Sequence, residues 1–113
     1  MKPANYPYPT MDDDGYELQL FEESAPGVSP DEARFATKPG DTVKLVFVYK
    51  EPVRNHGQYG AERMWVQVLR AEAGCLVGRL DSTPQFTDLL KSDSKVSFHP
   101  KHVLSFWTAP PVA

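Results

Sequence analysis

Apolar and polar residues alternate along much of the chain, and the alternation is clearest within residues 60–80. Over residues 64–69, one set of alternate positions carries Met and Val while the other carries Trp, Gln and Leu. This period-two pattern is typical of a half-buried strand. Residues 71–74 are a short link that ends at Gly74. They suit a tight hairpin, because glycine can take the positive φ that such a turn requires. Residues 75–80 continue the alternation, so the segment predicts a β-hairpin.

Four other segments complete the predicted strands. Residues 42–50 are the strongest of them, with apolar side chains on both faces, which indicates that both faces are partly covered. Residues 15–22 alternate as a half-exposed first strand. A strand over residues 95–99 leads through a single 3₁₀ step at residues 99–102 into a closing strand over residues 103–107.

One short helix is expected between the first strand and the strongest one. Ser29 is the predicted N-cap, with Pro30 at the first helical position and Glu32 completing a capping box. The helix must be short, because the breakers in residues 37–40 end it after about two turns. Within residues 81–91, Thr83 precedes Pro84 and is a second possible N-cap, so one helical turn is possible there.

The order of these elements predicts the fold class. A long strand, a long loop, a hairpin, a further strand, a 3₁₀ turn and a short closing strand favour a mainly β domain: a small SH3-like partly open barrel of about five strands with one short helix. The alternative is an α+β fold in which the helix packs on one face of an antiparallel sheet. A chain of 113 residues can bury one core without disulfides or metals. We therefore expect an extended N-terminal arm over residues 1–14, a single β-rich domain over residues 15–107 and a C-terminal tail over residues 108–113.

The charge balance bears on the partner. The formal net charge is -3 at pH 7, whereas nucleic acids and anionic membranes require cationic surfaces that displace counterions. We therefore expect neither as a partner, and a basic protein suits the chain better. Negative surface is expected from residues 12–14, 22–23 and 31–32. The first residues lack an apolar signal segment and no apolar run reaches about 20 residues, so a cytoplasmic location is predicted.

Metal and nucleophile chemistry has few candidates in this sequence. His56, His99, His102 and Cys75 are the soft ligands, and their spacing does not give the two recognisable pairs of a zinc site. The three aspartates of residues 12–14 lack the alternate spacing of a calcium loop, so a solvated turn is expected there. Cys75 lies within a predicted strand, where a lone cysteine is typically a small buried hydrophobe. We therefore expect no metal, no cofactor and no catalytic residue.

A long polar loop over residues 51–61 separates two core strands and is the candidate binding region. Tyr59 is the expected anchor, because tyrosine joins apolar area to a hydroxyl at modest entropic cost. Glu62 and Arg63, at the start of the next strand, form either an acid and cation pair over a pocket or an exposed edge pair of little energetic value. The candidate binding residues are Arg54, His56, Gln58, Tyr59, Glu62 and Arg63.

Three aromatic residues, Tyr59, Trp65 and Trp107, raise the question of a stacking platform. Small β-barrels that bind single strands stack bases on such residues beside a basic surface. This chain has an acidic balance and no basic stripe. We therefore expect both tryptophans in the core, where truncation to Ala costs about 3 to 5 kcal/mol.

Five spaced motifs resemble those of a known family. They are Glu62–Val66, Gly78–Leu80, Pro84, Lys95–Phe98 and Val103–Trp107. Together and in this order they are similar to the YegJ-like family of small bacterial proteins, a domain of unknown function. Its members carry a Glu-x-Met-Trp-Val strand, a Gly-x-Leu strand and a closing Ile-x-x-Trp.

The resemblance covers about residues 40 to 107 and departs from the family pattern in two places. Residues 92–93 are Ser-Asp where the family usually has Gly-Asp, and residues 29–36 replace an aromatic helix common upstream. Relatives in polymorphic-toxin immunity repertoires imply a toxin-neutralising role. We therefore expect a non-catalytic protein-binding domain, an immunity protein that occludes a basic toxin. The alternatives are a small-ligand-binding or regulatory module and, last, a small enzyme.

Overall fold

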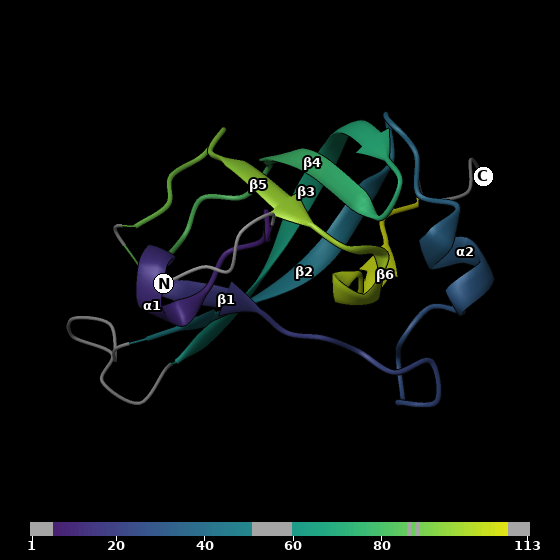
Figure 1. Ribbon diagram of the computed structural model, residues 1–113, viewed down its shortest axis with the longest axis horizontal. Coiled ribbons are helices and arrows are strands. Elements are labelled where there is room, and N and C mark those ends of the chain that lie inside the picture. Colours follow the sequence, from purple (N-terminus) through teal and green to yellow (C-terminus); the bar gives the residue numbers. More distant parts are fainter. Residues whose placement is uncertain (1–5, 51–59, 86, 88, 109–113) are drawn as a thin grey trace, which may run out of the picture.

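A computed structural model of the chain describes residues 6–50, 60–85, 87 and 89–108, and within them the protein is mainly β (Figure 1). Adjacent strands are antiparallel, in the order β1-β2-β3-β4-β5, and β6 pairs with β2 off this path. The strands are β1 (Tyr16–Leu18), β2 (Thr42–Tyr49), β3 (Ala61–Glu72), β4 (Cys75–Leu80), β5 (Lys95–Phe98) and β6 (Ser105–Phe106), and the helices are α1 (Met11–Asp14), α2 (Asp31–Phe35) and the 3₁₀ turn η1 (Pro100–His102).

The sheet curls because β2 is paired along both edges. One edge bonds to β3, while the other bonds to β1 near its end and to β6 near its beginning. The chain therefore returns through η1 to its first long strand, and the sheet forms a half-barrel (Figure 1). The predicted fold class, a small SH3-like partly open barrel, is confirmed. The predicted 3₁₀ step is present as η1, and the described residues hold two short α-helices where one was expected.

The core lies on the concave face of the sheet, as period two requires. Val43, Leu45 and Phe47 of β2 are fully buried, and they are joined by alternate residues in the middle of β3 and throughout β4. The core residues are Tyr16, Leu18, Val43, Leu45, Phe47, Tyr49, Met64, Val66, Val68, Leu76, Leu80, Leu90, Val96, Phe98 and Val103.

The β3–β4 hairpin is longer than expected, because β3 continues to Glu72 and leaves only Ala73 and Gly74 in the turn. Gly74 has φ 71°, as the predicted turn requires. The ladder shifts register between Val68 and Arg70, and this β-bulge bends the strand as the barrel curls.

The start of α2 differs from the prediction. Pro30 is the N-cap and makes no side-chain capping bond, so the expected Ser29 capping box is wrong. The backbone N–H of Asp31 donates instead to Glu23 Oε2 at 2.5 Å. The Glu23 carboxylate therefore accepts from a backbone N–H of the first helical turn that has no partner within the helix. Residue spacing within the helix does not predict this contact, because Glu23 lies in the preceding loop.

Three other segments also depart from expectation. Residues 11–14 form one helical turn, ended by Gly15 at φ 80°, rather than part of an extended arm. The first strand ends at Leu18, because Phe21 N donates to the carbonyl of Lys101 instead of continuing the ladder. The closing strand keeps only two residues, and the described residues of segment 81–91 contain no helix.

Candidate functional site

An open hollow of about 650 Å³ lies where β3 begins, at two of the predicted binding residues. Glu62 is half-buried there and Arg63 is exposed. Successive side chains of a strand point to opposite faces, and within the described ranges Arg63 makes no ion pair. Glu62 and Arg63 therefore do not form the acid and cation pair, and their role as binding residues stays a prediction. The hollow is lined by Ala61, Glu62, Arg63, Met64, Ser82, Thr83 and Gln85.

Within the part of the chain that the structure describes, donors from two other parts of the fold hold the Glu62 carboxylate. The Tyr49 hydroxyl donates to Oε1 at 2.7 Å, and the backbone N–H of Gln85 donates to Oε2 at 2.8 Å. Burial and the Glu62 carboxylate raise the pKa of Tyr49, so the phenol stays a donor. Glu62 thus joins the end of β2, the start of β3 and the segment at Gln85 beside the hollow.

The other predicted binding residues, Arg54, His56, Gln58 and Tyr59, lie outside the described residues. Their role as binding residues stays a prediction, and so does the choice of Tyr59 as the anchor.

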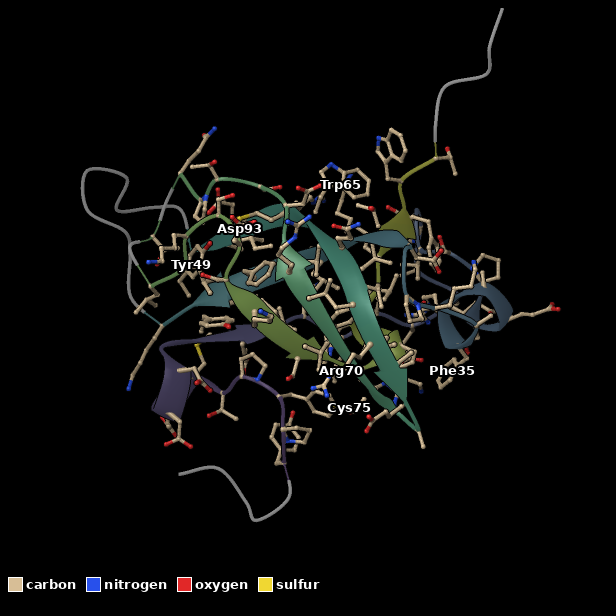
Figure 2. All side chains as sticks on the ribbon, turned by 90° about the horizontal axis from the view of Figure 1, so that it is seen from above. Phe35, Tyr49, Trp65, Arg70, Cys75 and Asp93 are labelled. Carbon is tan, nitrogen blue, oxygen red and sulfur yellow. The ribbon has the colours of Figure 1, made fainter. Side chains whose placement is uncertain are left out.

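A second hollow, of about 220 Å³, brings both tryptophans to the surface. Trp107 is 53% exposed, and Trp65 is half-buried on the outward face of β3, opposite Met64 and Val66. The expectation that both tryptophans lie in the core is therefore wrong: Trp107 is exposed, and Trp65 is not among the buried core residues. Figure 2 shows Trp65 far from the hairpin end at Cys75. The hollow is lined by Thr42, Trp65, Asp81 and Trp107.

Backbone hydrogen bonds hold the two tryptophans in place. The carbonyl of Trp65 accepts from Asp81 N at 2.9 Å, and Trp65 N donates to Ser82 Oγ at 3.0 Å. Trp107 N donates to the carbonyl of Thr42 at 2.9 Å, just beyond β6. Four segments far apart in the sequence thereby meet around one hollow, with Thr42 and Trp65 in strands of the sheet and Asp81 and Trp107 directly after strands.

Asp81 supplies the charge of this second hollow. Its side chain is exposed and has no ion-pair or hydrogen-bond partner in the part of the chain that the structure describes. Four other carboxylates form ion pairs within the described residues: Asp12 with Lys50, Asp31 with Arg34, Asp41 with Lys38 and Asp93 with Arg79. Asp81 therefore keeps its full hydrogen-bonding capacity beside two indoles.

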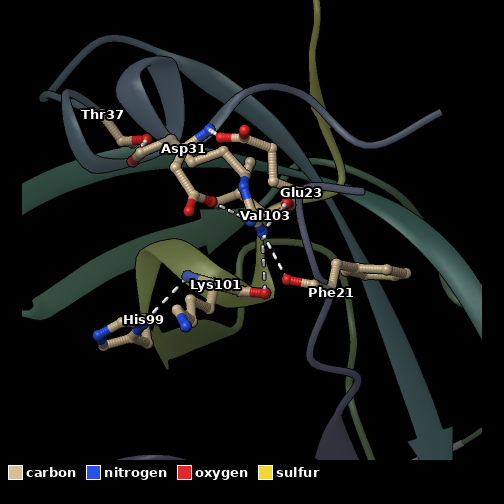
Figure 3. Close-up of polar contacts among 8 residues, drawn as sticks. Phe21, Glu23, Asp31, Thr37, His99, Lys101 and Val103 are labelled. Carbon is tan, nitrogen blue, oxygen red and sulfur yellow. Dashed lines mark hydrogen bonds and ion pairs between the residues drawn. The ribbon is translucent and has the colours of Figure 1, made fainter. Parts of the chain in front are cut away.

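Arg34 is a charged residue that the sequence did not single out. Its side chain is fully buried, and Nη1 donates to the carbonyls of Phe21, Lys101 and Val103 at 3.0, 3.2 and 3.3 Å (Figure 3). Nη2 pairs with the carboxylate of Asp31. The guanidinium joins α2, η1 and the loop after β1, which is a structural role. No local signal predicts this burial, because the acceptors come from segments far apart in the chain.

The histidine pair proves to be a cap. His102 Nδ1 accepts from His99 N at 2.8 Å, and His99 Nδ1 accepts from Lys101 N at 3.0 Å. Burial lowers the pKa of His99 and lowers that of His102 to about 4, so both rings stay neutral acceptors. Among the described residues no group of three metal-ligating side chains occurs, and His56 lies outside them. Cys75 is free and half-buried, less buried than expected.

The fold and its hollows define a class of protein: a small, mainly β, partly open barrel that displays an indole pair and a carboxylate on one outer surface. Comparisons with family models, with curated proteins and with solved structures found no match. No helix in the described part of the chain is long and apolar enough to cross a membrane.

Proposed function

We propose that this chain is a non-catalytic domain that binds a basic protein partner. The observation that carries the proposal is Trp107, which is 53% exposed beside Trp65 and Asp81. Tryptophan is among the residues most enriched at the energetic centre of protein interfaces, where a partner covers it. An exposed indole whose backbone is bonded to β2 is a ready anchor for such a partner.

The charge of the chain supports a basic partner. The net charge is -3, and the acidic residues include the exposed Asp12, Asp13, Glu22 and Glu23. A partner of opposite charge associates faster than a neutral one, because the electrostatic field steers encounter. The on-rate should therefore fall as salt is added.

The 51–61 loop is proposed as a second contact region. Its candidate residues Arg54, His56, Gln58 and Tyr59 follow β2 in the sequence, and Glu62 holds the start of β3 beside the larger hollow. Loops carried by a rigid sheet commonly supply binding residues.

Toxin neutralisation is the specific form of this function that we propose. Its support is the resemblance to the YegJ-like family, whose relatives occur in toxin immunity repertoires. The chain would then act in the cytoplasm by occluding a basic toxin, which requires affinity and coverage but no catalytic residue.

A small-ligand-binding module is the second candidate. The 650 Å³ hollow favours it, because Glu62 is held there by Tyr49 and by the Gln85 backbone. A polar group fixed in a hollow is a usual means of orienting a small ligand.

A pull-down from cells of the source organism tests the proposal, with the wild type beside Trp107→Ala and the double variant Arg54→Ala, Tyr59→Ala. The expected result is one basic protein whose recovery falls about tenfold or more in the Trp107 variant. Recovery should also fall in the double variant and at high salt. Co-expression then tests neutralisation, since a toxin should stop growth without this chain and not with it. Capture of no protein by the wild type would contradict protein binding and favour the small-ligand candidate.

A further inference from the structure

We propose that the hollow lined by Thr42, Trp65, Asp81 and Trp107 receives an arginine side chain of the partner. This inference rests on the proposed function and names the group that the surface recognises. It depends on three properties of the hollow: an exposed indole, an unpaired carboxylate and a backbone that holds both in place.

The chemistry of the hollow matches a guanidinium. Trp107 offers an exposed indole, and cations are attracted to the face of such a ring, tryptophan most strongly. Asp81 offers two carboxylate oxygens, which accept a bidentate pair of N–H bonds from arginine. Arginine makes both contacts at once, because its guanidinium is planar and stacks while its edge donates.

Other side chains fit less well. An apolar side chain would cover the Asp81 carboxylate without giving it a donor, and burying an unpaired charge is costly. Lysine carries a compact, strongly hydrated charge that cannot stack and bond bidentately together. An acidic side chain would meet the Asp81 carboxylate as a like charge.

Lys44 shows that an indole on this surface already holds a cation. Its Nζ lies 4.7 Å from the ring centroid of Trp65, its cross-strand partner. In the described part of the chain no cation lies over Trp107. The ring of Trp107 and the carboxylate of Asp81 are therefore the groups left for an incoming guanidinium.

The hollow is formed before any partner arrives. Backbone bonds of 2.9 Å from Asp81 N to the Trp65 carbonyl and from Trp107 N to the Thr42 carbonyl fix its walls. Ser82 Oγ also holds Trp65 N, at 3.0 Å. A site whose backbone is already ordered loses little conformational entropy on binding.

Titration of the ¹⁵N-labelled chain with N-acetylarginine amide tests the inference. The two tryptophans give two indole N–H signals, which Trp65→Phe and Trp107→Phe assign. The expected result is a saturable shift of the Trp107 signal with a dissociation constant of about millimolar order. N-acetyllysine amide should bind more weakly, and the neutral isostere N-acetylcitrulline amide should give no saturable shift.

Two matched carboxylate variants complete the experiment. Asp81→Asn should weaken binding of the arginine probe about threefold to tenfold. Asp93→Asn should leave it unchanged, because that carboxylate pairs with Arg79. The inference is overturned if the arginine probe gives no saturable shift, if the lysine or citrulline probe binds equally well, or if Asp81→Asn binds like the wild type.

This outcome is separable from that of the proposed function. A partner protein that requires Trp107, together with no response to the arginine probe, would leave protein binding in place and overturn the arginine site. An arginine response without any captured protein would support the site and contradict the proposed function.

Discussion

The guanidinium of Arg34 joins acceptors from separate segments, so its removal should weaken several contacts at once. Arg34→Ala would leave the carbonyls of Phe21, Lys101 and Val103 without this donor and open a cavity beside α2. We expect a loss of about 3 to 5 kcal/mol in the free energy of unfolding, measured by urea denaturation.

Arg34→Lys is the control for this prediction. Lysine keeps the charge and most of the aliphatic stem but lacks the planar guanidinium that reaches several acceptors. The free energy of unfolding of Arg34→Lys should therefore lie between those of the wild type and Arg34→Ala. An alanine variant within about 1 kcal/mol of the wild type would contradict the structural role of Arg34.

His102 should make stability depend on pH. Burial lowers its folded-state pKa to about 4, below the unfolded value near 6.5, so between these values the unfolded chain binds a proton that the folded chain does not. The contribution of the neutral His102 ring to the free energy of unfolding is therefore fully present above about pH 6.5. It is lost as the pH falls toward 4, by about 2 to 3 kcal/mol at pH 4.5.

Unfolding free energies at pH 7 and pH 4.5, for the wild type and His102→Asn, measure this effect. Asparagine keeps an oxygen that can accept from His99 N but does not titrate. The variant should lose less stability than the wild type over this pH range. Equal losses would show that other groups, carboxylates among them, account for the whole acid effect.

At the scale of elements, Gly78 marks the closest approach within the sheet. A Cβ at this position would lie 2.3 Å from Val66 Cγ1, 2.9 Å from the Gln67 carbonyl and 3.2 Å from Phe98 Cε1. Gly78→Ala should therefore destabilise the fold by about 2 to 3 kcal/mol, seen as a lower urea midpoint.

Gly60→Ala is the matched control, because no atom lies within 4 Å of its Cβ position. It should change the free energy of unfolding by less than about 0.5 kcal/mol. A tolerated Gly78→Ala would mean that β3, β4 and β5 pack less closely than described.

The strand faces were predictable from the sequence because period two depends only on local geometry. Met64, Val66 and Val68 are buried as the alternation indicates, while Trp65 and Gln67 face outward. Element ends were less predictable, because distant partners set them. The carboxylate that satisfies the start of α2 and the carbonyl that ends β1 both belong to segments outside those elements.

At the scale of the whole molecule, the indole site could not be predicted from spacing. Thr42, Trp65, Asp81 and Trp107 meet only because β6 closes back onto β2 and the chain leaves β4 beside Trp65. The sequence placed both tryptophans in the core, since it could not show that β6 stops at Phe106 and leaves Trp107 outside the ladder.

The most direct measurement of the central claim compares Trp107→Ala with Phe35→Ala. Both side chains are 53% exposed, and Phe35 lies on α2, away from Trp65 (Figure 2). We predict that both variants keep an unfolding free energy within about 1 kcal/mol of the wild type. Only Trp107→Ala should lose partner affinity, by about tenfold or more in titration against the captured protein. Unchanged affinity in Trp107→Ala, or a loss of about 3 to 5 kcal/mol in its stability as for a core tryptophan, would contradict the account.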